Sequence, residues 1–184
     1  MGVFILKKIA TIEHTHKDCY SQEEIRKASR AIVINQGLVL MIHSSVNGDY
    51  KFPGGGRKVF ETNIDNLIRE TKEETGYDVI RDSIRPFGYI EEIRDSSNNK
   101  DAIFKIISEY FLCDIANTKD SPCLEEYEKD FDYQTVFINP RYAIEQNEKL
   151  DKNEFPWIER EIIVLKIIDR LIGEKDESTD LLQS

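Results

Sequence analysis

Residues 55–77 read GGRKVFETNIDNLIRETKEETGY, and this stretch decides both the fold and the chemistry that we expect of the chain. Within it, Glu70, Glu73 and Glu74 stand at positions i, i+3 and i+4, so a helix places their carboxylates side by side on one face. Carboxylates this close repel one another unless a cation lies between them. Mg²⁺ and Mn²⁺ prefer oxygen ligands and bridge to substrate phosphates, so the pattern indicates a divalent-metal site for phosphate chemistry.

The periodicity around these glutamates predicts a helix over residues 63–75. Thr62 or Asn63 suits its N-cap, and Gly76 suits a left-handed residue at its C-terminal end. The glycine-rich run before it, residues 53–56, predicts a loop whose backbone can approach a ligand closely. The apolar positions of the helix share one stripe, which we expect to be buried while the glutamate face stays open: Ile64, Leu67, Ile68 and Thr71.

The same stretch resembles the signature of the Nudix hydrolases, in which glycine, glutamate and arginine recur at fixed spacings. Its glycine and charged positions are all matched here, by Gly55, Glu61, Arg69, Glu70, Glu73, Glu74 and Gly76. Thr71 and Tyr77 stand at two nominally apolar positions of the signature, and both can pack. Phe60 stands where many members of the family carry a glycine before the first glutamate, which bears on the conformation of this loop.

The resemblance implies roles for the residues that match. Glu70 and Glu74 are expected to be the principal metal ligands, Glu73 to share the metals or to orient water, and the Gly55 carbonyl to supply a backbone ligand. Arg69 and Glu61 complete the expected catalytic set, with Arg69 steadying the glutamates. Without the resemblance, a run of glutamates on a helix is more often a solvated face, and Glu61 with Arg69 a surface ion pair.

Residues outside the box have weaker signals. Lys51, Arg57 and Lys58 flank the glycine loop and are candidates to contact phosphate oxygens, although ordinary surface cations fit nearly as well. The family often takes a further base from the loop before its penultimate strand. Three glutamates lie in that region, and the sequence does not choose among them: Glu125, Glu126 and Glu128.

The remaining segments predict one α+β domain over residues 1–173, followed by a polar, flexible tail over residues 174–184. The resemblance implies an α/β/α sandwich, a mixed sheet with the catalytic helix and a C-terminal helix packed on it. Residues 21–29 are expected to be a short helix or a connection, and residues 156–172 a docked helix. Strands are expected at residues 3–12, 30–34, 38–43, 103–113 and 135–138, the fourth of them central.

Composition limits the classes of function. The 184 residues carry a formal net charge of −10, which argues against binding to a nucleic-acid duplex or an anionic membrane. The sequence has no apolar run long enough to cross a bilayer, and its first residues lack the features of a signal peptide. Its odd number of cysteines, Cys19, Cys113 and Cys123, contains no CxxC pair, so a reduced cytoplasmic setting is expected.

The resemblance implies Mg²⁺- or Mn²⁺-dependent hydrolysis of a phosphoanhydride in a nucleoside diphosphate linked to another moiety. The two products each carry phosphate. ADP-ribose-like compounds and nucleotide sugars rank ahead of nucleoside triphosphates as the small-molecule substrate. The alternatives are a nucleotide-binding regulator without turnover, and an isoprenoid diphosphate isomerase, for which Cys113 lies in an unsuitable apolar strand. Many relatives form homodimers, and the sequence does not fix the oligomeric state.

Overall fold

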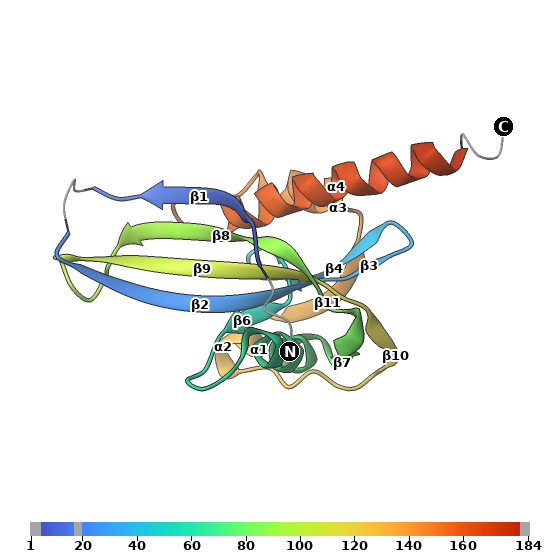
Figure 1. The fold of residues 1–184 in the computed structure, drawn as a ribbon, viewed down its shortest axis with the longest axis horizontal. Helices are drawn as coiled ribbons and strands as arrows, with labels where there is room; N and C mark the ends of the chain where they lie inside the picture. Colours follow the sequence, from blue (N-terminus) through green and yellow to red (C-terminus); the bar gives the residue numbers. More distant parts are fainter. Residues whose placement is uncertain (1–4, 17–19, 181–184) are drawn as a thin grey trace. The chain divides into compact units, whose positions relative to one another are not determined.

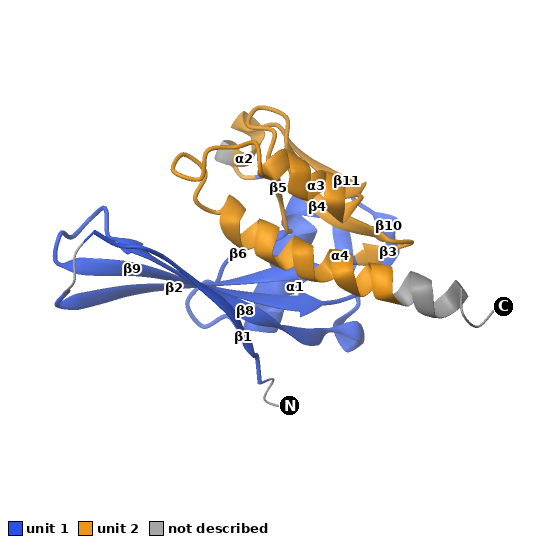
Figure 2. Cartoon of the chain, turned by 90° about the horizontal axis from the view of Figure 1, so that it is seen from above, with its two compact units in different colours: residues 1–33, 53–124 blue, residues 34–52, 125–184 orange. Residues whose placement is uncertain are grey.

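The computed structural model describes residues 5–16 and 20–180 (Figure 1). Its contacts divide the chain into two compact units, residues 1–33 with 53–124 and residues 34–52 with 125–184 (Figure 2). The first unit contains β1 (Lys8–His14), β2 (Gln22–Ile32), β6 (Gly54–Gly56), α1 (Asn63–Thr75), β7 (Tyr77–Val79), the 3₁₀ turn η1 (Arg81–Ser83), β8 (Arg85–Asp95), β9 (Ala102–Leu112) and β10 (Ile115–Lys119). The second contains β3 (Ile34–Asn35), β4 (Leu38–Ser44), β5 (Tyr50–Lys51), α2 (Glu126–Asp130), β11 (Tyr133–Ile138), α3 (Pro140–Asn147) and α4 (Ile158–Asp180).

The first unit is built on a mixed five-stranded sheet in the order β1-β8-β9-β2-β6. Strand β9 runs antiparallel to β8 and parallel to β2 in its centre, and β1 forms one edge, as the sequence predicted for both strands. The long strands β8, β9 and β2 lie side by side in Figure 1. The glycine-rich β6 forms the other edge, where a bulky side chain would separate it from α1. This arrangement confirms the α+β class.

The prediction of a helix or connection at residues 21–29 was wrong, because this segment belongs to β2. Its first half is polar and mostly exposed, which imitates a surface helix, whereas the half that ends at Ile32 is buried. Strand β2 pairs with β9 along its whole length and with β6 from Ala28 to Arg30. The backbone hydrogen bonds to two neighbouring strands therefore outweigh the weak local helix propensity of the segment.

Helix α1 has the bounds that the sequence predicted. The Thr62 side chain accepts a hydrogen bond from the Asp65 backbone N at 3.1 Å, and Gly76 ends the helix with a φ of 78°. Leu67 and Thr71 of the predicted apolar stripe are fully buried. The expectation of an open glutamate face was wrong in part, because Glu74 is only 4% exposed. The glycine strand β6 packs against α1, and Gly54 holds the Glu74 carboxylate there.

The second unit carries a small antiparallel sheet and the C-terminal helices. Strands β3 and β4 form a hairpin around Gln36 and Gly37, whose φ angles of 50° and 76° fit a tight turn. The strand expected at residues 30–34 is divided, because residues 30–32 belong to β2 and residue 34 begins β3. Strand β4 also pairs with β11 and β5, and α4 packs on α3 and β5. Helix α4 continues to Asp180, beyond the predicted end at residue 172. No helix among residues 5–16 and 20–180 is long and apolar enough to span a membrane.

Buried polar side chains fix the backbone of β5 in this unit. The Asn147 amide accepts from the Tyr50 backbone N and donates to the Tyr50 carbonyl, both at 2.8 Å. The Phe52 backbone N donates to Glu161 Oε2 at 3.0 Å, and Glu161 is fully buried beside Arg160. These bonds satisfy backbone groups that a two-residue strand leaves unpaired.

Candidate active site

The glycine strand β6 brings the backbone of the loop against the glutamates of α1. It pairs with β2 in the register Gly54 to Arg30, Ser29 to Gly55 and Ala28 to Gly56. The Gly54 backbone N donates to Glu74 Oε2 at 2.7 Å, which fixes the second glutamate of the Glu73–Glu74 pair. A charged acceptor makes this hydrogen bond strong, so the loop and the helix hold each other in place.

Glu70 lies against the same strand one residue further on. A Cβ built on Gly55 would fall 2.4 Å from Glu70 Oε2 and 2.6 Å from its carboxyl carbon, so only glycine leaves room for this carboxylate. The Gly55 carbonyl accepts from the Asn66 side-chain amide at 3.0 Å. Asn66 is fully buried one turn before Glu70, so α1 sets the position of the loop carbonyl.

The Arg69 guanidinium lies between three carboxylates of the signature, those of Glu61, Glu70 and Glu73. Its Nε and Nη2 bind the two oxygens of Glu61 at 2.7 and 3.0 Å, a bidentate pair. Its Nη1 donates to Glu70 Oε1 and to Glu73 Oε2, each at 2.7 Å. The guanidinium therefore joins the loop glutamate to two glutamates of the helix, and it offsets the repulsion that the sequence spacing creates.

A comparison with families of known proteins matches the NUDIX domain to residues 25–159, most of the chain. The chain belongs to the Nudix hydrolase family. A search of curated proteins gave no match. Among solved structures, a Nudix hydrolase from Nitrosomonas europaea superposes with a TM-score of 0.54 at 12% identity, covering 75% of this chain and 88% of that one.

Two further solved structures are similar at lower TM-scores. An ADP-ribose pyrophosphatase from Streptococcus suis is 20% identical with a TM-score of 0.42, covering 63% of this chain and 75% of its own. A MutT Nudix hydrolase from Burkholderia pseudomallei is 18% identical with a TM-score of 0.49, covering 67% of this chain and 98% of its own. The family match and the Nitrosomonas europaea structure show that the fold is that of the Nudix hydrolases, with the box helix and a C-terminal helix.

The charge network sets the protonation of the Nudix box. Hydrogen bonds from the Arg69 guanidinium lower the pKa of the Glu61 carboxyl, which is also bonded by the Lys58 backbone N. The same contacts with Glu61, Glu70 and Glu73 raise the pKa of Arg69. Both shifts favour the charged forms, so Glu61 is an anion and Arg69 a cation at neutral pH.

The donor set of the box fits a divalent metal. Glu70, Glu73 and Glu74 supply carboxylate oxygens and Gly55 a carbonyl, and hard cations such as Mg²⁺ bind these atoms. The Gly55 carbonyl already accepts from Asn66 and retains a second lone pair. Among residues 5–16, 20–126 and 128–174, no three acidic, histidine or cysteine side chains converge as a preformed ion cage. Arg69 instead holds Glu70 and Glu73 in the present arrangement.

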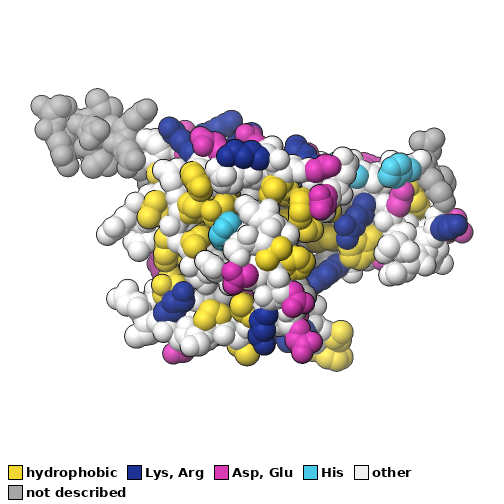
Figure 3. Space-filling model, turned by 180° about the vertical axis from the view of Figure 1, so that it is seen from behind, with side chains coloured by type: hydrophobic (Ala, Val, Ile, Leu, Met, Phe, Trp, Pro, Cys, Tyr) yellow, Lys and Arg dark blue, Asp and Glu magenta, His cyan; other side chains and the backbone are white. Residues whose placement is uncertain are grey.

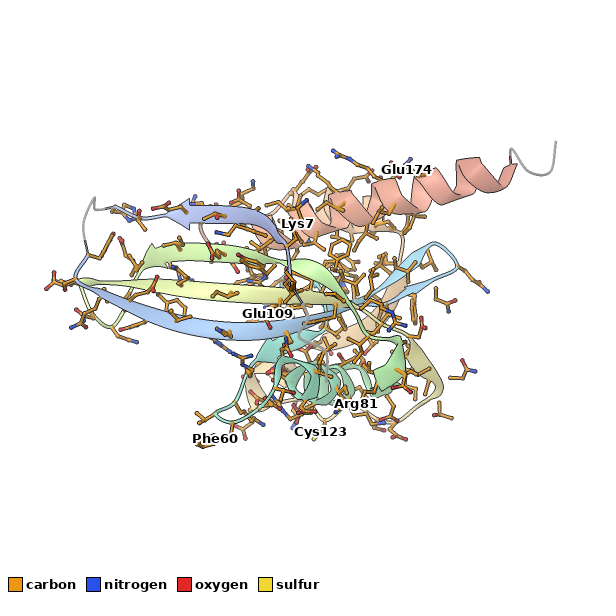
Figure 4. The ribbon with its side chains drawn as sticks, in the orientation of Figure 1. Lys7, Phe60, Arg81, Glu109, Cys123 and Glu174 are labelled. Atoms are coloured by element: carbon orange, nitrogen blue, oxygen red, sulfur yellow. The ribbon has the colours of Figure 1, made fainter. Side chains whose placement is uncertain are left out.

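Phe60, in the loop between β6 and α1, stands at the position where many members of the family carry a glycine. Phe60 has a φ of 68°, in the left-handed region that glycine favours, and its ring is fully exposed (Figure 4). This explains why a glycine is common at this position in the family, and it answers the question that Phe60 raised in the sequence. Phe60 keeps the required conformation at a cost in backbone strain.

The flanking cations differ in their surroundings. Arg57 follows β6, and its backbone N donates to the Lys27 carbonyl, while the Lys58 side chain is exposed. Lys51 belongs to the second unit, where its amino group lies 3.8 Å from the centre of the Tyr133 ring. A phosphate-binding role for the three remains a prediction.

The glutamates considered as a further base belong to the second unit and differ in exposure. Glu128 is 3% exposed and accepts a hydrogen bond from the Glu125 backbone N at 2.8 Å, whereas Glu125 and Glu126 are exposed. The Glu128 carboxylate therefore binds the backbone at the start of α2. The choice of base stays open.

One residue of the site was missed by the sequence analysis. Asn66 stands three and four positions before Arg69 and Glu70, on the same helix face, and its amide fixes the Gly55 carbonyl. A polar residue in line with the box residues was the available signal. Asparagine side chains often bond nearby backbone in any helix, so the residue type alone does not indicate a role in the site.

Proposed function

We propose that this Nudix hydrolase cleaves a phosphoanhydride in a nucleoside diphosphate linked to another moiety, using Mg²⁺ or Mn²⁺. One observation carries the proposal: two carboxylates of the box are fixed on the glycine strand, Glu74 by the Gly54 backbone N and Glu70 against Gly55. Carboxylates anchored beside an open backbone fit a site that binds metal and diphosphate together.

The metal would be held by Glu70 and Glu74, with Glu73 and the Gly55 carbonyl as further ligands. When bound, such an ion neutralises charge that develops on phosphoryl oxygens and lowers the pKa of water. Arg69 holds Glu61, Glu70 and Glu73 together at one end of the box through three ion pairs. Arg69 is accordingly a positioning residue, because its donors are directed at the glutamates.

ADP-ribose-like compounds and nucleotide sugars are our first choice of substrate, ahead of nucleoside triphosphates. Isomerisation of an isoprenoid diphosphate has little support. That reaction would need a cysteine that is accessible to the substrate and whose thiol has a pKa low enough to react. Cys113 is buried, and desolvation raises the pKa of its thiol to about 12. On the face seen in Figure 3, acidic and basic side chains are interspersed.

The test is a panel assay in which purified protein with Mg²⁺ or Mn²⁺ meets ADP-ribose, nucleotide sugars, dinucleoside polyphosphates and nucleoside triphosphates. Glu70→Gln and Glu74→Gln keep the shape of the side chain and remove its charge. We expect each variant to reduce kcat at least about 10²-fold, the loss expected for a charge-stabilising group in a phosphoryl-transfer site. Binding of Mn²⁺, followed by the amplitude of the free-ion electron paramagnetic resonance signal, should weaken in parallel.

The control is Glu154→Gln, which removes an exposed carboxylate of the second unit. It should leave both turnover and Mn²⁺ binding unchanged. Near-normal turnover by a well-folded Glu70→Gln protein would contradict the proposed role of the box. Metal binding without cleavage of any compound would favour the nucleotide-binding regulator.

A further inference from the structure

Four residues form a straight row across the sheet of the first unit. Gly55 on β6 is opposite Ser29 on β2, Ser29 is opposite Glu109 on β9, and Glu109 is opposite Tyr89 on β8. Residues directly opposite one another on paired strands project to the same face of a sheet. The Cβ direction of Gly55 meets the Glu70 carboxylate, so Ser29 and Glu109 project on the face that carries Glu70.

Two members of this row carry buried oxygens that no group in the described residues satisfies. Ser29 is 1% exposed and its Oγ has no hydrogen-bond partner. Glu109, labelled on β9 in Figure 4, has its Oε2 buried and likewise without a partner. Buried carboxylate and hydroxyl oxygens are almost always hydrogen-bonded in folded proteins. Two neighbouring exceptions on the face of the box indicate that a ligand supplies the missing donors.

The neighbouring acids show how unusual Glu109 is. Glu91 lies on the same face two residues along β8 from Tyr89, and its carboxylate accepts from the Lys8 amino group at 2.6 Å. Glu61 and Glu70 are bound by Arg69. Within the row, Ser29 and Glu109 are therefore the residues whose buried oxygens can accept hydrogen bonds from a ligand.

We propose that Ser29 and Glu109 bind the hydroxyl groups of the sugar ring that adjoins the reacting diphosphate. A carboxylate accepts hydrogen bonds and repels phosphate oxygens, so the substrate part it meets is an uncharged donor. A vicinal diol offers two donors, one for each acceptor of the pair. Neighbouring strands lie about 4.8 Å apart, so Ser29 and Glu109 stand roughly one and two strand spacings from Gly55. The sugar would extend along the row, away from the diphosphate at Glu70.

The inference rests on the proposed function, because it takes the Glu70 side of the row as the diphosphate site. It assigns Ser29 and Glu109 a role in specificity, since a site built to bind hydroxyls rejects an analogue that lacks them. Neither residue lies in the Nudix box, and neither is needed to hold the metal. Their substitution should therefore change which nucleotide is bound, with little effect on how tightly Mn²⁺ binds.

The experiment is isothermal titration of the full chain, in the presence of Mg²⁺, with α,β-methylene-ADP and with its 2′,3′-dideoxy counterpart. The two probes differ only in the hydroxyl groups, and neither can be cleaved at the bridging carbon. We expect the wild type to bind the hydroxylated probe about tenfold more tightly, and Ser29→Ala and Glu109→Gln to reduce that preference to about threefold or less. Affinity for the dideoxy probe should change less than about twofold.

Glu91→Gln serves as the matched control, because it alters an acid on the same face that already has a partner. It should keep the wild-type preference. Thermal unfolding of each variant reports its folding, and Ser29→Ala tests the pair with the smaller change if Glu109→Gln is unstable. Glu109→Ala extends the test by removing the acceptor oxygen that glutamine retains, and it should abolish the contribution of Glu109 to the preference.

Several outcomes overturn the inference: equal affinity of the wild type for the two probes, no binding of either, or an unchanged preference in the Ser29 and Glu109 variants. A large loss of Mn²⁺ affinity in Glu109→Gln also overturns it, because Glu109 would then be a metal ligand. These outcomes differ from the outcome that would overturn the hydrolase proposal. A protein that prefers the hydroxylated probe but cleaves no substrate supports this inference and overturns the hydrolase, and cleavage without the preference does the reverse.

Discussion

The Glu70 carboxylate occupies the space in which a Cβ of Gly55 would lie, with Oε2 only 2.4 Å from that position. The glycine of the signature is therefore required by an acid fifteen positions along the chain, and not by a turn at residue 55. The contact places a metal-binding carboxylate directly against backbone. It also yields a sharp test of the site.

Gly55→Ala should displace Glu70 while leaving the fold intact. The added methyl group meets the end of a flexible side chain, so the carboxylate moves and the backbone does not need to. We expect kcat to fall about 10²-fold or more, since a displacement of about 1 Å in a catalytic group has effects of this size. Steady-state kinetics on the substrate found in the panel assay, with circular dichroism of the variant, measures the effect.

Gly56→Ala is the matched control one residue along the same strand. Its Cβ would lie 2.7 Å from the Arg26 guanidinium, a long side chain that can move without affecting the box. Its kcat should stay within about threefold of the wild type, because the added methyl group meets Arg26 and leaves the Gly56 carbonyl available to Arg69. Equal losses in the two variants would show that the strand, and not Glu70, is what an added methyl disturbs.

The pair between Arg69 and Glu61 should make stability depend on pH in the acid range. Arg69 lowers the pKa of Glu61 below its ordinary value of 4.5, so the pair stabilises the folded state above that pH. The contribution is lost as the pH falls through the lowered pKa, since the folded protein must then protonate Glu61. The difference in unfolding free energy between wild type and Glu61→Gln should be largest near neutral pH and shrink below pH 4.5.

Urea unfolding of both proteins at a series of pH values measures this difference. Glu154→Gln, an exposed acid outside the box, should show no such trend. A constant difference down to the acid limit would mean that the Arg69 contact does not perturb Glu61.

Phe60 should be replaceable by glycine with a gain in stability. A φ of 68° strains the backbone of any residue that has a Cβ. The Phe60 ring is fully exposed, so its removal eliminates no packing contact. We expect Phe60→Gly to raise the free energy of unfolding by about 1 kcal/mol, and Phe60→Val to lower it by a similar amount. The measurement is the urea midpoint at constant m-value.

Val59 provides the comparison for this loop, because it is 81% exposed beside Phe60 and has no positive φ. Val59→Gly should lower stability slightly, since glycine adds freedom to the unfolded chain without relieving strain. The same sign for Val59→Gly and Phe60→Gly would argue against strain at residue 60.

Asn147 should be a large contributor to the stability of the second unit. Its side chain makes both backbone hydrogen bonds of Tyr50 inside the core, so Asn147→Ala leaves a buried donor and a buried acceptor unsatisfied. We expect a loss of about 3 kcal/mol in the free energy of unfolding, measured by urea denaturation. Asn153→Ala, an exposed asparagine, should cost less than about 1 kcal/mol.

The sequence by itself determined the features that local spacing controls. The periodicity of residues 63–75 predicted α1 and its C-terminal Gly76, because a helix repeats every 3.6 residues, and the matched signature positions indicated the family. The structure chose Thr62 over Asn63 as the N-cap. The strand after residue 37 and the central strand β9 also followed from apolar runs.

Only the tertiary structure decided what depends on partners far along the chain. Residues 21–29 become a strand because β9 and β6 pair with them, and Glu74 is buried because β6 packs on α1. The meeting of Ser29, Gly55 and Glu109 is set by strand register, and no property of the three residues predicts it. Register depends on hydrogen bonds between distant segments, whereas helix spacing is carried within the segment itself.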